Sequence, residues 1–241
     1  PVLTPVPEPE GSTDVGTLIA VEGVDGAGKF TLSSRLVRAW ERAGIDAVRV
    51  GFPRYGESIH ADLAAEALAG EHGDLAGGVN AMAVLFALDR AGAAADLRRM
   101  LHRHDVVLLD RYVASNAAYS AARRHEDAAG PTVEWVRALE FDRLVLPVPD
   151  VQIYLEVPVS VAEERARGRE EADESRARDA YERDGGLQER TAAVYAGLAA
   201  RSWVSPWVVV GSGAADEIEA DSDRLAAQLL DRTAESDGMT R

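Results

Sequence analysis

The chain has 241 residues, 46% of them hydrophobic, and a formal net charge of −15. This length suits one large α/β domain, no apolar run approaches the ~20 residues that cross a bilayer, and no signal peptide is visible, so we expect a cytoplasmic protein. The acidic charge argues against nucleic acid or a membrane as a partner, and the absence of cysteine excludes disulfides, thiolate metal sites and cysteine nucleophiles.

Strand-like and helix-like segments alternate along most of the chain. Residues 1–17 are rich in proline, glycine and acid and predict a disordered leader, and the polar residues 232–241 predict a frayed tail. Between them, over residues 18–231, short apolar runs predict strands at Leu18–Val21, Ala47–Phe52, Asp105–Asp110, Val151–Val157 and Trp207–Val210. Helical spacing predicts helices at Thr31–Arg42, Ile59–Ala69, Val79–His102, 113–124, 132–142, Val159–Arg167, Leu187–Ala200 and Ile218–Leu230. This order predicts a single α/β domain with a central parallel sheet covered by helices on both faces.

A glycine-rich turn follows the first predicted strand. The run Gly23-Val-Asp-Gly-Ala-Gly-Lys29 matches the first seven positions of the phosphate-binding loop G-x-x-x-x-G-K. Glycines let successive backbone N–H groups turn around phosphate oxygens, and the next helix points its positive end at the same anion. Lys29 is the only lysine in the sequence, and we expect it to reach the β and γ phosphates of ATP. The expected ATP-binding residues are Gly23, Val24, Asp25, Gly26, Ala27, Gly28, Lys29, Phe30 and Thr31.

The residue after Lys29 departs from this motif. A Ser or Thr there supplies a hydroxyl that helps to hold Mg²⁺, but this chain has Phe30, and Thr31 follows on a different side of the helix. A phenyl ring cannot coordinate a hard cation that prefers oxygen ligands. We therefore expect phosphates, water and carboxylates to hold Mg²⁺, and the candidate carboxylates are Asp25, Asp110 and Glu182.

Five motifs in a fixed order make the chain resemble bacterial thymidylate kinase, particularly the mycobacterial type, over about residues 18–210. They are Glu22-Gly-Val-Asp-Gly-Ala-Gly-Lys29, Phe52-Pro-Arg-Tyr55, Leu85-Phe-Ala-Leu-Asp-Arg90, Asp110-Arg-Tyr112 through Tyr119, and Arg176-Ala-Arg-Asp-Ala-Tyr-Glu-Arg183. The resemblance implies a P-loop nucleoside monophosphate kinase with a mobile, arginine-containing lid, here about residues 167–179. It also implies transfer of the γ-phosphate of ATP to dTMP with Mg²⁺, and a homodimer.

The resemblance further implies a role for each matched residue. Arg54, Tyr55 and Arg111 would grip the 5′-phosphate of dTMP. Phe86 would stack on the thymine, and Arg90 would bond its exocyclic oxygen. Asn116 would contact the pyrimidine edge, Tyr119 the sugar 2′ position, and Asp25 the 3′-hydroxyl. The remaining substrate-binding candidates are Phe52, Asp179 and Tyr181, and the catalytic candidates are Lys29, Arg111, Asp25, Arg169 and Arg176.

Three alternatives compete with this interpretation. A deoxynucleoside kinase would normally need a carboxylate base just after the second strand, where this chain has Phe52-Pro-Arg-Tyr55. A P-loop switch protein would need an Asn-Lys-x-Asp element, which is impossible when Lys29 is the only lysine. The third alternative is a nucleotide-binding relative that Phe30 has made inactive, and only a turnover assay separates it from an enzyme.

Overall fold

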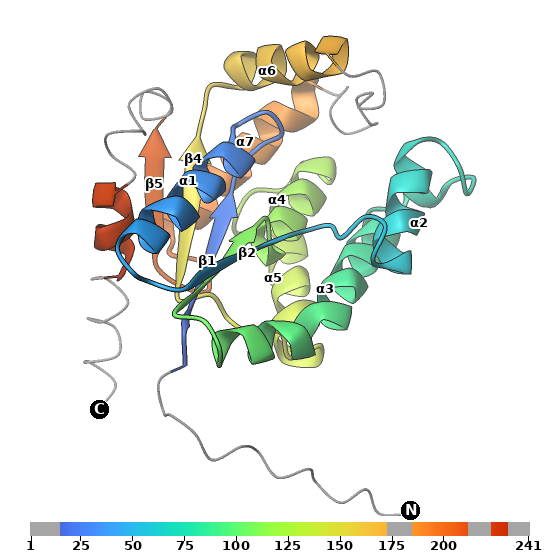
Figure 1. The fold of residues 1–241 in the computed structure, drawn as a ribbon. Coiled ribbons are helices and arrows are strands. Elements are labelled where there is room, and N and C mark those ends of the chain that lie inside the picture. Colours follow the sequence, from blue (N-terminus) through green and yellow to red (C-terminus); the bar gives the residue numbers. More distant parts are fainter. Residues whose placement is uncertain (1–14, 173–184, 212–222, 231–241) are drawn as a thin grey trace, which may run out of the picture.

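The computed structural model describes residues 15–172, 185–211 and 223–230, which form one parallel sheet between helices (Figure 1). The strands are β1 (Thr17–Glu22), β2 (Ala47–Gly51), β3 (Val106–Asp110), β4 (Val151–Glu156) and β5 (Trp207–Gly211). They lie in the order β2-β3-β1-β4-β5, and each neighbouring pair is parallel. The predicted α/β fold class is confirmed, and every strand agrees with its predicted bounds to within one residue at either end.

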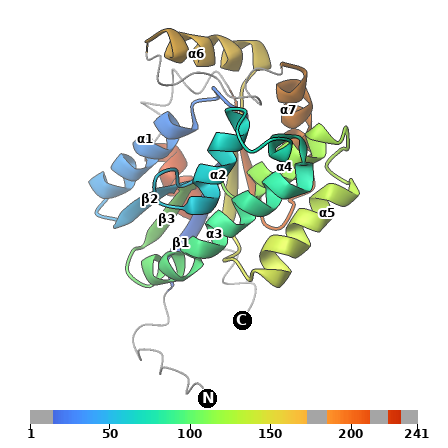
Figure 2. The ribbon, with the colours of Figure 1, turned by 90° about the vertical axis from the view of Figure 1, so that its right-hand side faces the viewer.

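Helices cover both faces of this sheet (Figure 2). On one face lies α1 (Lys29–Arg42), and residues 223–230 pack beside it, where Trp40 Nε1 donates a 3.1 Å hydrogen bond to the carbonyl oxygen of Ala226. The opposite side carries α3 (Val79–Leu101), α4 (Val113–Arg123), α5 (Pro131–Arg137) and α7 (Gly185–Ala200). Packed on α3 is α2 (Ile59–Leu68), with the short 3-10 turn η1 (Leu75–Gly77) between them, and α6 (Val159–Ala172) lies beyond the carboxyl ends of the strands. Because both faces are covered, the central strands are almost entirely apolar and buried.

The ends of several elements differ from the prediction. The predicted leader is too long, because the backbone N–H of Gly16 donates a 2.7 Å hydrogen bond to the carbonyl of Leu101 and β1 begins at Thr17. The helix predicted to end at Arg167 continues to Ala172, so the start of the expected lid is helical. The rest of that lid lies outside the described residues. So do residues 1–14, residues 231–241 and the first residues of the last predicted helix.

The predicted helix 132–142 is wrong in its second half. After α5 ends at Arg137, the chain widens into a π-helical stretch, η2 (Ala138–Arg143). Such stretches are rare and often lie at functional sites. Here the wider turn carries Glu140, which is 0% exposed, into contact with buried polar groups of α3 and α4. A pattern of apolar spacing does not encode that change of pitch.

The parallel strands bring their carboxyl ends to one edge of the sheet, where open α/β sheets bind ligands. The glycine-rich loop leaves β1 at this edge and enters α1. Gly26 has a φ of +82°, and a Cβ added there would collide with the carbonyl oxygen of Ala162 in α6. Only glycine fits at this position, which lets the loop lie directly against the backbone of α6.

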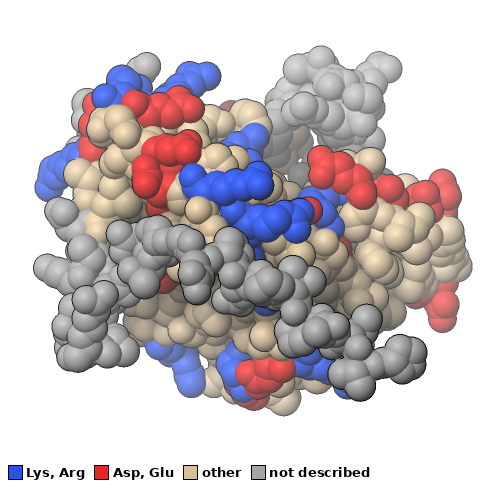
Figure 3. Space-filling model, turned by 60° about the horizontal axis from the view of Figure 1, so that its bottom comes forward, with Lys and Arg blue, Asp and Glu red and all other residues tan. Residues whose placement is uncertain are grey.

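Charged side chains of both signs are interspersed on the face shown in Figure 3, with acidic side chains gathered toward α2. Among the described helices, none has the length and apolar character of a membrane span.

Candidate active site

The side chain of Lys29 is hydrogen-bonded to the backbone of the glycine-rich loop. Lys29 begins α1 and is only 7% exposed. Its Nζ donates hydrogen bonds to the carbonyl oxygens of Gly23 (3.0 Å) and Val24 (2.8 Å). No side chain caps the first turn of α1, so its backbone N–H groups are available to an anion.

Burial and, after it, the neighbouring positive charge of Arg111 lower the pKa of Lys29 to about 7. The carboxylates of Asp25, Asp110 and Glu22 oppose this shift. The Lys29 ammonium therefore gains its full charge near neutral pH only when another anion, such as a phosphate, joins it.

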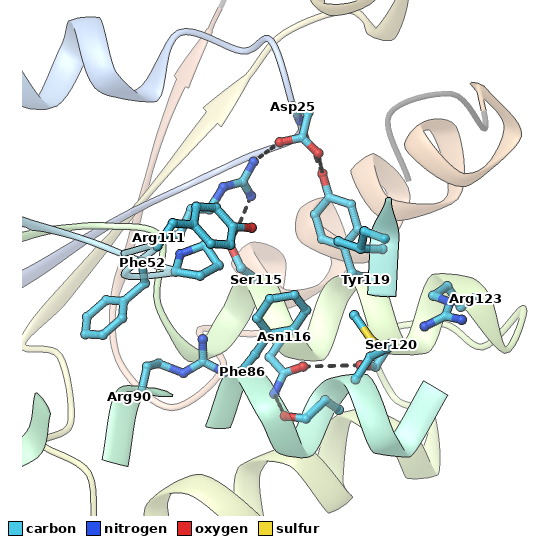
Figure 4. A pocket seen from close by; sticks show the side chains of 15 residues that line it. Asp25, Phe52, Phe86, Arg90, Arg111, Ser115, Asn116, Tyr119, Ser120 and Arg123 are labelled. Atoms are coloured by element: carbon cyan, nitrogen blue, oxygen red, sulfur yellow. Dashed lines mark hydrogen bonds and ion pairs between the residues drawn. The ribbon is translucent and has the colours of Figure 1, made fainter. Parts of the chain in front are cut away.

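A cavity beside this loop gathers most of the predicted acceptor residues (Figure 4). Its predicted lining residues are Asp25, Phe52, Tyr55, Phe86, Arg90, Arg111, Asn116 and Tyr119. It is also lined by Pro53, Leu68, Met82, Ala83, Ser115, Ser120 and Arg123. The cavity thus combines apolar walls with a few polar groups, which is typical of sites for small organic ligands.

One end of the cavity is charged and lies next to the glycine-rich loop. Arg111 has a left-handed φ of 67°, which turns the chain sharply between β3 and α4. Its Nη2 forms an ion pair with Asp25, and its Nη1 donates to the carbonyl oxygen of Gly23 at 3.3 Å. The same carbonyl accepts from Lys29, so two cations from different elements converge on one oxygen atom.

Tyr119 closes this end of the cavity. Its hydroxyl donates a 2.6 Å hydrogen bond to Asp25 Oδ2. Gln188 Oε1 of α7 accepts from the backbone N–H of Asp25 at 3.4 Å and contacts the Tyr119 hydroxyl at 3.2 Å. Burial and the Asp25 carboxylate raise the pKa of Tyr119 well above its ordinary value, so the hydroxyl stays protonated and remains a donor. Burial by itself would raise the pKa of Asp25, but the charges of Arg111 and Lys29 outweigh it and the pKa is lowered.

The other end of the cavity is built around a buried ion pair. Arg90 Nε and Nη2 donate to the two carboxylate oxygens of Glu140 at 2.5 and 2.7 Å. Asn116 Nδ2 donates to Glu140 Oε1 at 2.7 Å and to the carbonyl of Ala83 at 2.9 Å. Glu140 therefore fixes both side chains, and it orients the Asn116 amide so that its oxygen is the atom left for a ligand.

Not every predicted residue reaches the cavity. Arg54 does not line it, because Arg54 Nε forms an ion pair with Asp89 (2.9 Å) and Nη2 donates to the carbonyl oxygen of the same residue (2.6 Å). Asp110 lies at the end of β3 and pairs with Arg49 at 3.3 Å. Arg169 belongs to α6, but its side chain lies outside the described residues, as do Arg176, Asp179, Tyr181 and Glu182.

The carboxylates near the loop differ in whether they have an oxygen available to bind a metal ion. Both carboxylate oxygens of Asp25 already accept hydrogen bonds, one from Arg111 and one from Tyr119. Asp110 Oδ2 accepts from Arg49, and within the described part of the chain no hydrogen bond reaches its Oδ1. Asp110 thus offers an oxygen of the kind that Mg²⁺ prefers, whereas Phe30 offers none.

Several lining residues had no place in the sequence prediction. Ser115, Ser120 and Arg123 could have been found from helical spacing along α4. Ser115 lies four residues before Tyr119, and Ser120 and Arg123 lie four and seven residues after Asn116. Glu140 and Gln188 gave no such signal, since each contacts its partners across many residues and from another helix.

The chain is similar to known thymidylate kinases. A family model described as "Thymidylate kinase" matches residues 21–204. The chain is 58% identical over 212 residues to the thymidylate kinase of Mycobacterium tuberculosis (strain CDC 1551 / Oshkosh), a match that covers 88% of this chain and 96% of the relative. It is 34% identical over 176 residues to the thymidylate kinase of Akkermansia muciniphila, which covers 71% of this chain and 74% of the relative.

Proposed function

Because this chain belongs to the thymidylate kinase family and transfers the γ-phosphate of ATP to dTMP, we propose that the glycine-rich loop binds ATP and the adjoining cavity binds dTMP. The observation that carries this division is the meeting of Lys29 and Arg111 on the carbonyl oxygen of Gly23. A phosphate bound by each cation would lie next to the other. Phosphoryl transfer needs this alignment and charge neutralisation more than it needs covalent help from the protein.

The polar end of the cavity binds the phosphate and sugar of dTMP in this proposal. The guanidinium of Arg111 suits a phosphate because it donates in a fixed fork. Asp25 and Tyr119 form a hydrogen-bonded pair that can receive the 3′-hydroxyl while leaving little room beside the ring. The acceptor is already a phosphate dianion, so no general base is assigned.

The other end of the cavity binds the base and distinguishes thymine from cytosine in this proposal. Asn116 Nδ2 donates to Glu140 and Ala83. Among the described residues, only Ser120 donates to the Asn116 oxygen, at 3.4 Å. A free amide oxygen pairs with the N3–H of thymine, whereas cytosine presents an acceptor there. Phe86 supplies a face for stacking, and Arg90 presents its remaining donors to a carbonyl of the base.

We expect Asn116→Ala to weaken the use of dTMP by roughly 10- to 100-fold, because a lost buried polar partner costs about 1–3 kcal/mol. ADP release would be measured with dTMP, dCMP, UMP, AMP, GMP and thymidine as acceptors, for wild type and the variant. Wild type should prefer dTMP, and Asn116→Ala should lose most of its preference over dCMP. A wild-type preference for a purine nucleotide or for unphosphorylated thymidine would contradict the assignment of this cavity.

We further propose that the reaction requires Mg²⁺, which would neutralise charge on the ATP phosphates, with Asp110 as the described carboxylate best placed to bind it or its water. The expected lid arginines, Arg169 and Arg176, would stabilise the migrating phosphoryl group. A homodimer in the cytoplasm is proposed from the family resemblance, and the chain's own acidic charge supports the absence of a nucleic acid partner.

The lowered pKa of Lys29 makes nucleotide binding dependent on pH. In the free protein Lys29 is protonated below about pH 7 and largely neutral above it. Bound phosphates favour the charged form, so binding above pH 7 must take up a proton, and affinity should fall by up to about tenfold per pH unit.

The proton uptake can be measured directly. Calorimetry of ADP binding at pH 8 in two buffers of different ionisation enthalpy should show uptake approaching one proton. The Lys29→Met variant should show none. Equal heats in both buffers for the wild-type protein would contradict the assigned state of Lys29.

A further inference from the structure

Phe30 contacts Arg49, a residue that does not line the cavity. Phe30 as a whole is 63% exposed, yet the guanidinium carbon of Arg49 lies 4.3 Å from its ring centroid. Arg49 belongs to β2, which packs beside α1 at the front of the sheet in Figure 1. A planar guanidinium over an aromatic face is held by cation–π attraction, so Phe30 acts as a platform for Arg49.

The same guanidinium reaches the end of the next strand. Arg49 Nη1 donates to Asp110 Oδ2 at 3.3 Å, and the two side chains are 30% and 15% exposed. By contrast, the surface pair Arg42–Asp223 has side chains that are 59% and 64% exposed. The Arg49–Asp110 pair is therefore better shielded from solvent than an ordinary surface ion pair, and its geometry is less easily lost.

Asp110 stands beside the two cations of the phosphate site. It precedes Arg111 in the sequence, and its charge is close enough to Lys29 to influence the pKa of that amine. With Oδ2 bound to Arg49, the carboxylate presents Oδ1, to which no other described group donates.

We propose that Arg49, supported by the ring of Phe30, is a positioning residue that fixes the Asp110 carboxylate for the Mg²⁺–nucleotide complex. This pair compensates for the hydroxyl ligand that the loop lacks at Phe30. The inference rests on the proposed function, and it adds a residue from β2 that none of the five motifs contains. Outer-shell partners of ligating carboxylates typically change metal affinity by about 10- to 100-fold when they are removed.

The test uses Arg49→Met, which removes the guanidinium and keeps an unbranched side chain. Arg42→Met is the matched control, because it removes an arginine from an exposed ion pair. Binding of Mn²⁺ to the complex of full-length protein with ADP and dTMP is followed by electron paramagnetic resonance. Affinity for ADP is measured separately in EDTA, and turnover is titrated with Mg²⁺.

Arg49→Met should weaken Mn²⁺ binding about tenfold or more and raise the half-saturating Mg²⁺ concentration by a similar factor. Its ADP affinity in EDTA should stay within about twofold of wild type, since the residue acts through Asp110. Asp110→Asn should show the same loss of Mn²⁺ affinity, and adding Arg49→Met to it should cause little further loss. Arg42→Met should match wild type in all three measurements.

Two results would overturn the proposal. If Arg49→Met leaves both Mn²⁺ binding and ADP affinity unchanged, the Arg49–Asp110 pair is only a structural contact. If it lowers ADP affinity in EDTA and leaves Mn²⁺ binding unchanged, Arg49 is a direct phosphate ligand. If Arg49→Met does not fold, Phe30→Leu replaces it, with a smaller loss in the same direction. Failure of the proposed function would instead appear as wild-type protein that does not phosphorylate dTMP, so the two outcomes are distinguishable.

Discussion

Replacing Lys29 by Met should lower kcat by at least ~10²-fold, the typical loss for one preorganised charge stabiliser. The ammonium is the only lysine charge in the chain, and it lies at the start of α1 where the loop turns around the expected phosphates. Methionine keeps the length and apolar volume of the side chain but offers no donor. Steady-state ADP release at saturating ATP and dTMP measures the effect.

The fold should tolerate this change. The Lys29→Met substitution would not strand either carbonyl that Lys29 now contacts, because Gly23 also accepts from Arg111 Nη1 and Val24 also accepts from the N–H of Ala27. Removing a buried amine whose pKa is lowered by burial also removes an unfavourable charge. A thermal unfolding midpoint at or above the wild-type value is therefore expected, and near-normal turnover by such a well-folded variant would refute the role assigned to Lys29.

Replacing Arg111 by Met should lower kcat/KM for dTMP by about 10²- to 10³-fold, because the acceptor phosphate loses its fork of charge-assisted donors. The change also strips Asp25 of its ion-pair partner and removes donors from Gly23 and Ser115. Asp25 keeps the hydrogen bond from Tyr119 and is partly exposed, so we expect a loss of only about 1–3 kcal/mol in stability.

Two further variants separate charge from geometry at this position. Arg111→Lys keeps the positive charge without the planar fork, and it should recover only part of the lost kcat/KM. Arg137→Met removes an arginine that pairs with Glu134 and Asp142 on the surface, and it should leave the kinetics unchanged. An Arg111→Met enzyme that uses dTMP as well as wild type does would show that the acceptor phosphate binds elsewhere.

The parallel sheet and the glycine-rich loop could be predicted because their signals are local. Buried parallel strands appear as short apolar runs, and the loop needs glycine and lysine at fixed spacing. The cavity was predicted in part for a similar reason. Phe86 and Arg90 share a face of α3, and Asn116 and Tyr119 share a face of α4, so helical spacing kept each pair together.

The contacts that fix those side chains could not be predicted, since they depend on tertiary packing. Glu140 reaches Arg90 and Asn116 only because the helix widens at η2, and nothing in the local sequence announces that change. The side chain of Arg54 was expected to face the acceptor phosphate, and its ion pair with Asp89 of α3 was not predicted. Phe30 was interpreted only as the loss of a ligand, and its contact with the Arg49 guanidinium was not predicted.

In the proposed site Lys29 binds the donor phosphates and Arg111 binds the acceptor phosphate, at adjoining positions. Calorimetric titration of ADP and of dTMP, each alone, into wild type, Lys29→Met and Arg111→Met tests it directly. We predict that Lys29→Met weakens ADP about tenfold or more and spares dTMP, while Arg111→Met weakens dTMP by at least as much and spares ADP. Loss of ADP binding in Arg111→Met with normal dTMP binding, or no selective loss in either variant, would contradict this division of the site.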